Sequence, residues 1–272
     1  MRGENQRASE RGRNVPVAER ILEVVDLTKQ YGSRGSVTHA LRGISMAVDR
    51  GEFVGVMGPS GSGKTTLLNV ISTIDSPSSG RVWIGGRELT ALRRREVARF
   101  RRERLGFIFQ DFNLLDTLTL RENIGLALSI AWAPAGEIDR RVAEMAERLG
   151  IADALDKFPY QVSGGQKQRA AAARALITEP DLVLADEPTG NLDSRAARSL
   201  LEALAELNRD LQTTIILVTH DPVAASYCQR ILFIKDGRIF GELVRGDSPR
   251  QRFFDRILAV LAELGGGEAD VR

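Results

Sequence analysis

The stretch Gly58-Pro59-Ser60-Gly61-Ser62-Gly63-Lys64-Thr65-Thr66 follows a short apolar run and precedes a segment expected to be helical. It fits the pattern G-x-x-x-x-G-K-[ST], which is typical of a loop that wraps phosphate groups. Glycines let backbone N–H groups turn toward phosphate oxygens, and the following helix adds the positive end of its dipole. Lys64 is expected to reach the β- and γ-phosphates, and the Thr65 hydroxyl to bind Mg²⁺. A nucleoside triphosphate with Mg²⁺ is therefore the predicted ligand.

The segments on either side of this loop predict an α/β fold. The apolar run Glu52–Met57 is a candidate buried strand, and a helix is expected over Lys64–Ile74. Leu182–Ala185 and Thr214–Val218 are near-continuous apolar runs, typical of parallel strands covered on both faces. A right-handed crossover helix is expected between them, marked by Leu200, Leu201, Leu204 and Leu207.

Further elements are expected on both sides of this unit. Leu22–Tyr31, Ala40–Val48 and Arg81–Ile84 are interpreted as strands of a smaller β layer. The middle of the chain is expected to be helical, because apolar residues recur at helical spacing, at Ile138, Val142, Met145 and Leu149. A hairpin turn is expected at residues 235–237. A last helix has an apolar side formed by Phe253, Phe254, Ile257, Leu258, Leu261 and Leu264.

An apolar strand that ends in two acids, Leu182–Glu187, complements the phosphate loop. A carboxylate at the carboxyl end of a buried strand is well placed to hold Mg²⁺, directly or through water, and this role is assigned to Asp186. Glu187 follows one residue later and is the candidate that polarises the attacking water. The loop and the acids together predict a phosphate-loop NTPase.

A second helix start with phosphate-binding character lies at Val162–Arg169, which reads VSGGQKQR. Ser163 is expected to cap a helix whose alanine-rich sequence is strongly helix-forming. Its serine and two glycines suit a second set of phosphate oxygens. One nucleotide on one chain should not need two such cradles. The second cradle is therefore expected to close on the nucleotide held by another copy of the chain.

Composition limits the classes open to this chain of 272 residues. A formal net charge of +2 is too small to imply a nucleic-acid partner. The single cysteine, Cys228, excludes an internal disulfide and is interpreted as a packed thiol; His39 is interpreted as structural. The longest apolar stretch, Ile124–Ala135, falls short of the roughly 20 residues that cross a bilayer. A soluble chain is expected, so any membrane part must come from another polypeptide.

Two basic segments stand apart from this balanced charge. One is an N-terminal arm with Arg2, Arg7, Arg11 and Arg13, and the other, Arg93–Arg104, holds seven arginines. Residues 1–18 contain few apolar positions and are expected to be disordered. The second segment is interpreted as a solvated helix face. Contact with anionic lipid headgroups is the alternative interpretation of both.

In order along the chain, these motifs resemble those of ATP-binding-cassette (ABC) ATPases, over roughly residues 20–245. By this resemblance Gly58–Thr66 is the Walker A loop and Leu182–Glu187 is Walker B. Ser163–Gln166 corresponds to the signature sequence. Asn191–Asp193 corresponds to the D-loop.

The resemblance also implies roles for single residues. Tyr31 matches the aromatic residue that stacks on adenine. Gln110 matches the Q-loop glutamine, which would sense Mg²⁺ and the attacking water and pass its position to a helical region that touches a permease. His220 matches the switch histidine, and Asp221 and Pro222 are expected to begin the next helix as its N-cap and first residue. The imidazole is thereby expected to face the γ-phosphate.

The implied cofactors are ATP and Mg²⁺. The catalytic residues would be Lys64, Gln110, Glu187 and His220. The metal would be held by Thr65, Gln110 and Asp186. The nucleotide would be bound by Tyr31, Gly58, Ser60, Gly61, Ser62, Gly63, Lys64, Thr65, Thr66, Ser163, Gly164, Gly165, Gln166 and Asp193.

The fold implied by the resemblance is α/β: a phosphate-loop (RecA-like) ATPase core, a small antiparallel β layer and a helical subdomain. The expected organisation is a basic arm over residues 1–18 and an ATPase domain over 19–245. The helical subdomain is expected at about 111–165, and a C-terminal helical extension over 246–272.

The residues next to and between the motifs resemble those of a narrower group. Gly190–Asp193 and Phe107–Gln110 resemble the ATPases that serve FtsX/MacB-type permeases. Phe112–Thr119, His220–Cys228 and the tail from Arg252 resemble the bacitracin-resistance (Bce-type) ATPases within it. This likeness implies two copies that power a large FtsX-like permease at the cytoplasmic face of the membrane. It also implies protection against cell-wall-targeting peptide antibiotics, and signalling to a sensor histidine kinase through the permease.

Two other classes are weighed against this interpretation. A soluble ABC ATPase of DNA repair or translation usually carries long insertions, zinc-binding cysteines or two cassettes, whereas Gln110 and Ser163 are only 53 residues apart (163 − 110). A MacB-like, lipoprotein-release or cell-division ATPase would show the same ATPase chemistry. The C-terminal helix and the neighbouring genes would separate that class from the Bce-type interpretation.

Overall fold

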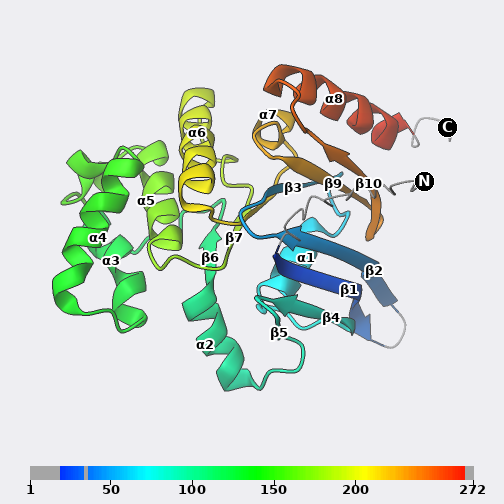
Figure 1. The fold of residues 1–272 in the computed structure, drawn as a ribbon, viewed down its shortest axis with the longest axis horizontal. Helices are drawn as coiled ribbons and strands as arrows, with labels where there is room; N and C mark the ends of the chain where they lie inside the picture. The colour runs from blue at the N-terminus through cyan, green and yellow to red at the C-terminus, as the bar shows by residue number, and fades with distance from the viewer. Residues whose placement is uncertain (1–18, 34–35, 267–272) are drawn as a thin grey trace, which may run out of the picture.

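The computed structural model describes residues 19–33 and 36–266, so the predicted basic arm at 1–18 lies outside the described residues. Two sheets and two groups of helices form the fold, and helices from distant parts of the chain flank the larger sheet (Figure 1). The predicted α/β class, with a parallel core, an antiparallel layer and a helical region, is confirmed. Among the described residues, no helix is both long enough and apolar enough to span a bilayer.

The larger sheet has the strand order β10-β9-β3-β8-β7-β6. The four pairings among β9, β3, β8, β7 and β6 are parallel, and the edge strand β10 pairs with β9 in antiparallel fashion. Parallel strands end at the same edge of a sheet, so the residues that follow β3, β7 and β8 are brought together. The strand bounds are Phe53–Met57 (β3), Leu105–Ile108 (β6), Leu182–Asp186 (β7), Ile215–Val218 (β8), Arg230–Lys235 (β9) and Arg238–Val244 (β10).

The smaller sheet is antiparallel, with the order β2-β1-β4-β5. Its first two strands run further than the sequence predicts. They are long because register shifts absorb residues with a positive φ, such as Asp26 (φ 48°) and Gly43 (φ 87°), which interrupt the alternation of apolar residues. The bounds are Arg20–Ser33 (β1), Ser36–Asp49 (β2), Ser79–Ile84 (β4) and Arg87–Glu88 (β5).

Helix α1 (Lys64–Ile71) packs between the two sheets. Its buried residues Leu67, Leu68 and Ile71 belong to a core that also contains side chains of β1, β2, β3 and β4. The helix ends three residues before the predicted end at Ile74, because Ser72 caps it and Thr73 adopts a φ of 60°. This core fixes the start of α1, and with it the phosphate loop, against the end of β3.

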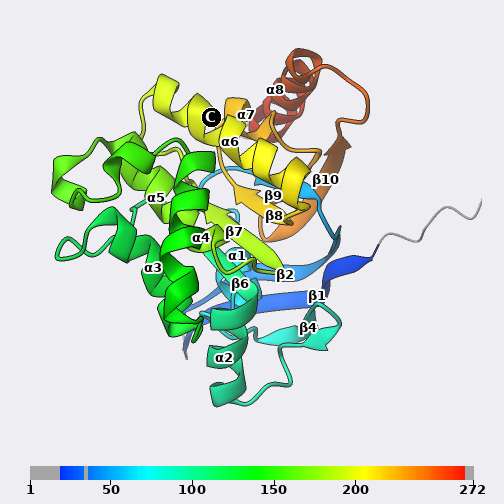
Figure 2. The same ribbon diagram turned by 60° about the vertical axis from the view of Figure 1, so that its left-hand side comes forward.

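Apart from α2, whose Phe100 joins the first core, the other helices form a second core on the opposite face of the parallel sheet (Figure 2). A helical lobe of α3, α4 and α5 packs against α6 and against the inner side chains of β3, β6, β7 and β8. α8 covers the other end of that face through Phe253 and Ile257. The bounds are Arg94–Arg104 (α2), Leu120–Ile130 (α3), Ala135–Arg148 (α4), Gly164–Leu176 (α5), Ser194–Leu211 (α6), Pro222–Ala225 (α7) and Arg250–Gly266 (α8). Short 3₁₀ helices occupy Ala152–Ala154 and Pro159–Gln161.

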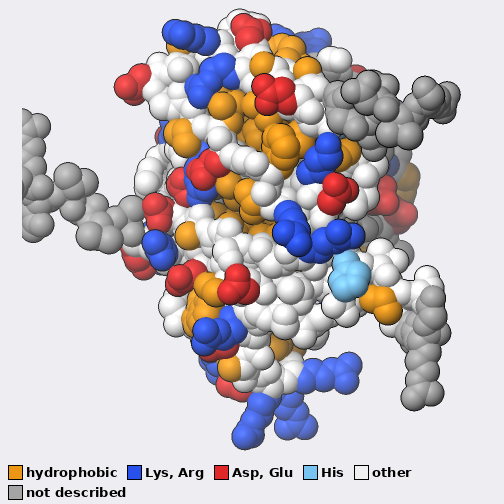
Figure 3. Space-filling view, turned by 90° about the vertical axis from the view of Figure 1, so that its right-hand side faces the viewer, with side chains coloured by type: hydrophobic (Ala, Val, Ile, Leu, Met, Phe, Trp, Pro, Cys, Tyr) orange, Lys and Arg blue, Asp and Glu red, His pale blue; other side chains and the backbone are white. Residues whose placement is uncertain are grey.

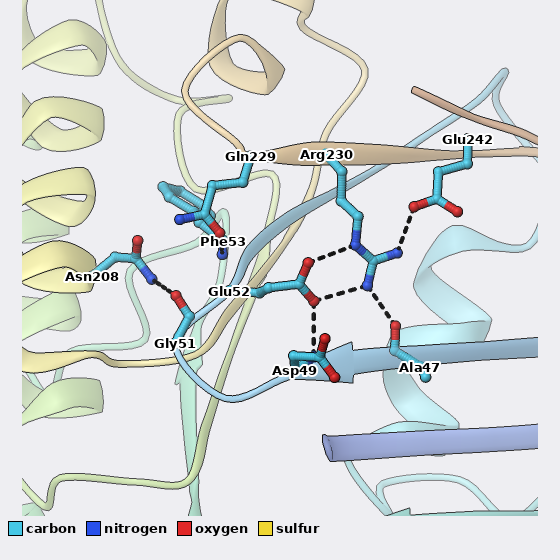
Figure 4. Close-up of polar contacts among 9 residues, drawn as sticks. All are labelled: Ala47, Asp49, Gly51, Glu52, Phe53, Asn208, Gln229, Arg230 and Glu242. Atoms are coloured by element: carbon cyan, nitrogen blue, oxygen red, sulfur yellow. Dashed lines mark hydrogen bonds and ion pairs between the residues drawn. The ribbon is translucent and has the colours of Figure 1, made fainter. Parts of the chain in front are cut away.

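A polar network ties the two sheets together at the start of β3 (Figure 4). Arg230 of β9 donates to both carboxylate oxygens of Glu52 at 2.8 and 2.9 Å, and to Glu242 of β10 at 3.0 Å. The same guanidinium reaches the carbonyl of Ala47 in β2 at 2.5 Å. Paired guanidinium–carboxylate bonds of this kind are charge-assisted and geometrically specific. The network therefore holds the antiparallel layer against the strand that leads into the phosphate loop.

Candidate nucleotide site

The phosphate loop connects β3 to α1 and is shaped by glycines that no other residue could replace. A Cβ on Gly58 (φ 153°) would overlap the carbonyl oxygen of Ile234, and one on Gly63 (φ 103°) would lie 2.5 Å from the carbonyl oxygen of Ala40. Gly63 is the N-cap of α1 and no side chain caps that helix. The first N–H groups of a helix have no partner within it, so the loop and α1 together present donors suited to an anion.

Lys64 is buried, with 9% of its surface exposed. Its Nζ donates to the carbonyl oxygens of Gly58 and Pro59 at 2.8 and 2.9 Å, so the side chain folds back over the loop. Burial lowers the pKa of Lys64, and the carboxylates of Glu187 and Asp186 oppose that shift. The ammonium thus lies in the loop, within the field of both acids that follow β7.

Asp186 is the last residue of β7, and one of its carboxylate oxygens, Oδ1, is buried without a hydrogen-bond partner. Burial raises the pKa of Asp186; the charge of Glu187 acts in the same direction, and the Thr65 side chain acts against it. A buried carboxylate oxygen with no donor is suited to bind a cation, and the side chain of Thr65 lies close enough to Asp186 to influence its pKa. These residues fit Mg²⁺, which is commonly held by one or two carboxylates together with substrate phosphates.

Glu187 leaves β7 in the left-handed region, with φ 46°, which is a strained conformation for a residue with a side chain. Its carboxylate is held from β8. His220 donates its backbone N–H to Oε1 at 3.0 Å, its ring Nδ1 lies 2.7 Å from the same oxygen, and Thr219 donates to Oε2 at 3.2 Å. The strain and the contacts fix the direction of this carboxylate at the carboxyl edge of the sheet.

His220 follows β8 and starts the turn into α7. The predicted caps are confirmed: Asp221 accepts from the N–H of Val223 at 2.8 Å, and Pro222 is the first residue of the helix. The imidazole is 76% exposed, whereas the Glu187 side chain is 18% exposed. The histidine therefore bridges a partly buried carboxylate and the open side of the loop.

A cavity of about 660 Å³ lies over the loop. Its walls include the loop, His220 and the turn after β9, and one wall comes from the end of α8, with Leu261, Leu264 and Gly265 as its contributors. This part of the site is not expected from the sequence, where the C-terminal segment has no assigned role. No local signal marks it, because the contact joins segments some two hundred residues apart.

Two predicted nucleotide contacts are engaged elsewhere in the chain. The hydroxyl of Tyr31, in β1, donates to Asp75 at 2.7 Å, and its ring is 42% exposed beside the loop that follows α1. Asp193 caps α6 by accepting from the N–H groups of Arg195 and Ala196, both at 2.9 Å. An exposed ring can still offer a stacking face, whereas the Asp193 carboxylate already has two donors.

The second predicted cradle lies away from the phosphate loop, at the start of α5 in the helical lobe (Figure 1). Ser163 caps this helix as predicted, accepting from the N–H of Gln166 at 3.3 Å, and Gln166 returns a bond to the backbone of Ser163. Gly165 lies so close to Ala196 of α6 that a Cβ there would be 2.9 Å from the alanine methyl. Its neighbours are thus the D-loop and α6.

Known proteins with similar sequences carry the function that the site geometry indicates. The family model described as "ABC transporter" matches residues 41–190. The chain is 53% identical over 250 residues to the bacitracin export ATP-binding protein BceA of Halalkalibacterium halodurans, which covers 92% of this chain and 99% of that protein. The chain belongs to the ABC transporter family. It is accordingly an ABC ATPase.

Two further ABC proteins show how far the likeness extends. The chain is 42% identical over 219 residues to the macrolide export ATP-binding/permease protein MacB of Marinobacter nauticus, which covers 80% of this chain but 34% of that protein. A dimeric ATP-binding cassette, MJ0796, in a post-hydrolysis state bound to ADP and Pi, superposes with a TM-score of 0.76 at 36% identity. That match covers 82% of this chain and 98% of the other.

The Q-loop glutamine of this ABC ATPase is directed at the D-loop. Gln110 Nε2 lies 3.4 Å from the Asn191 side-chain oxygen, and Asn191 donates in turn to the carbonyl of Gln110 at 3.2 Å. A Cβ on Gly190 would be 2.9 Å from the Gln110 amide. The Q-loop and the D-loop therefore pack against each other through the side chain of Gln110.

A residue that the sequence leaves without a role, Gln168, links three motifs of the site. It lies on the signature helix α5 and is fully buried. Its Nε2 donates to the carbonyls of Phe109 and Pro188, at 2.8 and 2.7 Å, while its Oε1 has no partner. Phe109 precedes the Q-loop glutamine and Pro188 follows Glu187. The only sequence signal is its place in the signature stretch, which does not reveal the two carbonyls.

Proposed function

We propose that this chain is the ATP-hydrolysing subunit of a bacterial ABC transporter whose FtsX-like permease exports, or confers resistance to, cell-wall-targeting peptide antibiotics. The observation that carries the proposal is the likeness at 53% identity, over nearly the full length of both chains, to a protein named for bacitracin export. The site geometry supports the ATPase part. Lys64, Asp186, Glu187 and His220 converge on one loop from three neighbouring strands.

In the proposed reaction the phosphate loop binds the ATP phosphates, and Lys64 exchanges its two carbonyl contacts for phosphate oxygens. Glu187 accepts a proton from the attacking water, and His220, already hydrogen-bonded to it, stabilises charge at the γ-phosphate. Thr65, Asp186 and Gln110 would hold Mg²⁺, which supplies charge neutralisation at the phosphates. Tyr31 offers its ring to the adenine.

The proposed active form contains two copies, because Ser163–Gln166 are too remote to serve the phosphate loop of their own chain. In this arrangement each ATP lies between one copy's Walker A loop and the partner's signature sequence. The backbone N–H groups at the start of α5 then supply donors to the phosphates. The dimeric MJ0796 cassette with ADP and Pi supports such an assembly.

The permease is proposed to dock in a groove beside the Q-loop. A cavity of about 510 Å³ lies between α2, α3, α5 and β6, with apolar walls that include Phe107, Phe109, Leu126 and Ile130. Phe109 directly precedes Gln110 in the chain. A permease segment that displaces Phe109 would therefore also displace the Q-loop glutamine. Docking there would place the chain at the cytoplasmic face of the membrane. A sensor histidine kinase, reached through the permease, belongs to the same proposal.

A MacB-like, lipoprotein-release or cell-division role is the second candidate, and it rests on the 42% identity to the ATP-binding part of a MacB protein. The two candidates share their ATPase chemistry and differ in the permease. The coverage favours the first candidate, because 99% of the bacitracin-related protein is matched but only 34% of the MacB protein.

The test is affinity purification of the chain with membrane extract of its own bacterium, followed by identification of the copurified permease and a bacitracin susceptibility assay of the deletion strain. A large FtsX-like permease with a sizeable extracellular domain and increased susceptibility are expected. A small four-helix partner with unchanged susceptibility would transfer the chain to the cell-division class. Phe109→Ser should abolish copurification without removing ATP binding, and Phe240→Ser, at an exposed position in β10, is the matched control.

A further inference from the structure

The C-terminal helix α8 carries two apolar faces. Phe253, Ile257 and Leu264 are buried in the core, with exposures of 0%, 0% and 4%. A second stripe, Phe254, Leu258, Leu261 and Gly265, recurs at the helical spacing i, i+4, i+7 and i+11. At 3.6 residues per turn it lies about 100° round the helix from the buried face. The sequence groups both sets into one apolar side, whereas in the structure the second stripe lies at the margin of the core, which only Leu261 of the stripe partly contacts.

The second stripe remains accessible although its residues are apolar. Leu258 is 43% exposed, and Phe254 and Leu261 are partly buried. Figure 3 shows hydrophobic side chains gathered on the face of the molecule to which α8 and β10 belong. A contiguous apolar patch on a soluble surface indicates an interaction site more often than scattered single residues do.

α8 is fixed in place on the ATPase core. Arg250 lies over the ring of Tyr227 at 4.2 Å, and Arg256 donates to the carbonyl of Val244 at 3.0 Å. At the other end, Lys235 Nζ donates to the carbonyl of Leu264 at 3.0 Å, which suits the negative end of a helix dipole. The stripe is therefore held in one orientation, so a partner that binds it loses little free energy in ordering the helix.

The stripe leads directly into the nucleotide site. Leu261 and Gly265 form a wall of the same cavity as the phosphate loop and His220. In the proposed ATP-bound dimer a second copy covers that cavity, because its Ser163–Gln166 must approach the loop. A surface that approaches the loop across this cavity therefore lies beside the end of α8.

We propose that the outer stripe of α8, formed by Phe254, Leu258, Leu261 and Gly265, is an interface with the second copy of this chain that forms when ATP closes the dimer. This inference rests on the proposed ATP-bound dimer and adds a contact outside the shared motifs. The apolar stripe loses water on closure, so α8 strengthens dimerisation without touching the reacting phosphate.

The experiment uses the full chain with Glu187→Gln, a change expected to allow ATP binding and dimer closure while blocking hydrolysis. Leu258→Glu places a charge in the stripe, and Ala259→Glu places the same charge about 100° further round the helix, at an exposed position. Sedimentation with ATP is expected to show dimerisation weakened about tenfold or more by Leu258→Glu, as for a central interface residue, and unchanged by Ala259→Glu. Binding of a fluorescent ATP analogue to the monomer should be equal in all three proteins.

A second measurement guards against misfolding of the glutamate variant. The one native cysteine, Cys228, is fully buried, so a cysteine introduced at Leu258 or Ala259 reports alone. Maleimide labelling of Leu258→Cys is expected to slow on ATP addition in the Glu187→Gln background, while labelling of Ala259→Cys stays constant. Equal dimerisation of both glutamate variants, or unslowed labelling at 258 in a dimer, overturns the α8 interface. Failure of the Glu187→Gln parent itself to dimerise with ATP overturns the proposed dimer instead.

Discussion

The phosphate loop and the signature helix are both helix starts built from serine and glycine, yet the structure treats them differently. At the loop, side chains from the ends of β3, β7 and β8 gather within one chain, and Lys64, Asp186, Glu187 and His220 act on one another. At the signature helix, Ser163 and Gln166 satisfy each other, and the neighbours are the D-loop and α6. The phosphate loop therefore has most of its catalytic groups within one chain. Among the described residues, the start of the signature helix has none of these four side chains beside it.

This difference teaches that the fold alone prearranges only the part of the chemistry that one chain can supply. The parallel sheet brings the acids to the loop because parallel strands end at one edge. Nothing in the sheet brings α5 to the same edge, since α5 belongs to the helical lobe. A second copy is the economical way to join the two halves. Substitutions can disable one half, both halves, or the contacts that link them.

The largest effect is expected from breaking the loop half. Lys64→Ala removes the buried ammonium that lies among Gly58, Pro59 and the two acids. Loss of one such charge from a phosphate-transfer site is expected to lower kcat by about 10²–10³-fold or more. Steady-state phosphate release measures it, with Lys157→Ala, an exposed lysine on the helical lobe, as the matched control. A variant that turns over normally would remove Lys64 from the reaction.

Breaking the two halves in different copies sharpens the comparison. Ser163→Arg alone should also be nearly inactive, because it places a bulky charge at the cradle that serves the partner's ATP. Mixed with Lys64→Ala, it should regain activity. In a mixed dimer one site combines the intact loop of the Ser163→Arg copy with the intact signature of the Lys64→Ala copy. About a quarter of the intact activity is expected from random pairing of equal amounts, since roughly half of the dimers carry one good site.

The complementation assay needs each variant alone as its control, at the same total protein concentration. Activity that stays at the sum of the two single variants would mean that each chain works with its own signature helix. That result would contradict the two-copy site while leaving the role of Lys64 intact. A rise with mixing time, as copies exchange, is the expected course.

The sequence predicts the loop half well because its chemistry is local. Gly58–Thr66 and Leu182–Glu187 carry their function in adjacent residues, and the apolar runs around them are strands as predicted. The caps Ser163 and Asp221 are likewise predicted from a residue and the few that follow it. Errors of a few residues at element ends, as at α1, come from single backbone conformations such as that of Thr73.

The contacts that join distant segments could not be predicted in the same way. Gln168 binds two loop carbonyls, 59 and 20 residues away along the chain, and neither distance leaves a periodic trace in the sequence. The end of α8 lies beside the phosphate loop because the helix packs on the core and Lys235 of β9 binds the carbonyl of Leu264. Side chains of ordinary type gain these roles from topology, so a single sequence supplies no signal for them.

Breaking the link between the halves should have a smaller effect than breaking either half. Gln168→Leu keeps the size of the side chain but leaves the carbonyls of Phe109 and Pro188 without their donor. Two buried carbonyls left unpaired are expected to lower the free energy of unfolding by about 1–3 kcal/mol. We expect kcat to fall about tenfold or less, which corresponds to about 1.4 kcal/mol of transition-state stabilisation, with ATP affinity unchanged.

The separate measurement of kcat, ATP affinity and unfolding distinguishes positioning from simple destabilisation. Gln251→Leu, at an exposed position of α8, is the matched control, since it removes the same amide without leaving buried carbonyls unpaired. If Gln168→Leu is destabilised and yet turns over at the normal rate at low temperature, Gln168 serves only the fold. If kcat falls while stability and ATP affinity hold, the link transmits position between the signature helix and Glu187.

The smallest effect on catalysis is expected at the network between the two sheets, which lies on the loop side but away from the phosphates (Figure 4). Arg230→Met removes the partner of Glu52, whose side chain is 23% exposed, and frees Glu242. Loss of these charge-assisted bonds is expected to cost about 2–3 kcal/mol of unfolding free energy. Denaturant unfolding measures it, with Arg238→Met, at an exposed position of β10, as the control. At denaturant concentrations too low to unfold the variant, kcat should stay within about twofold of the unmodified chain. A twofold change corresponds to about 0.4 kcal/mol in the activation free energy, and a larger one is not expected from a contact distant from the phosphates. A large loss of kcat with intact stability would show instead that the sheet junction sets the position of the phosphate loop.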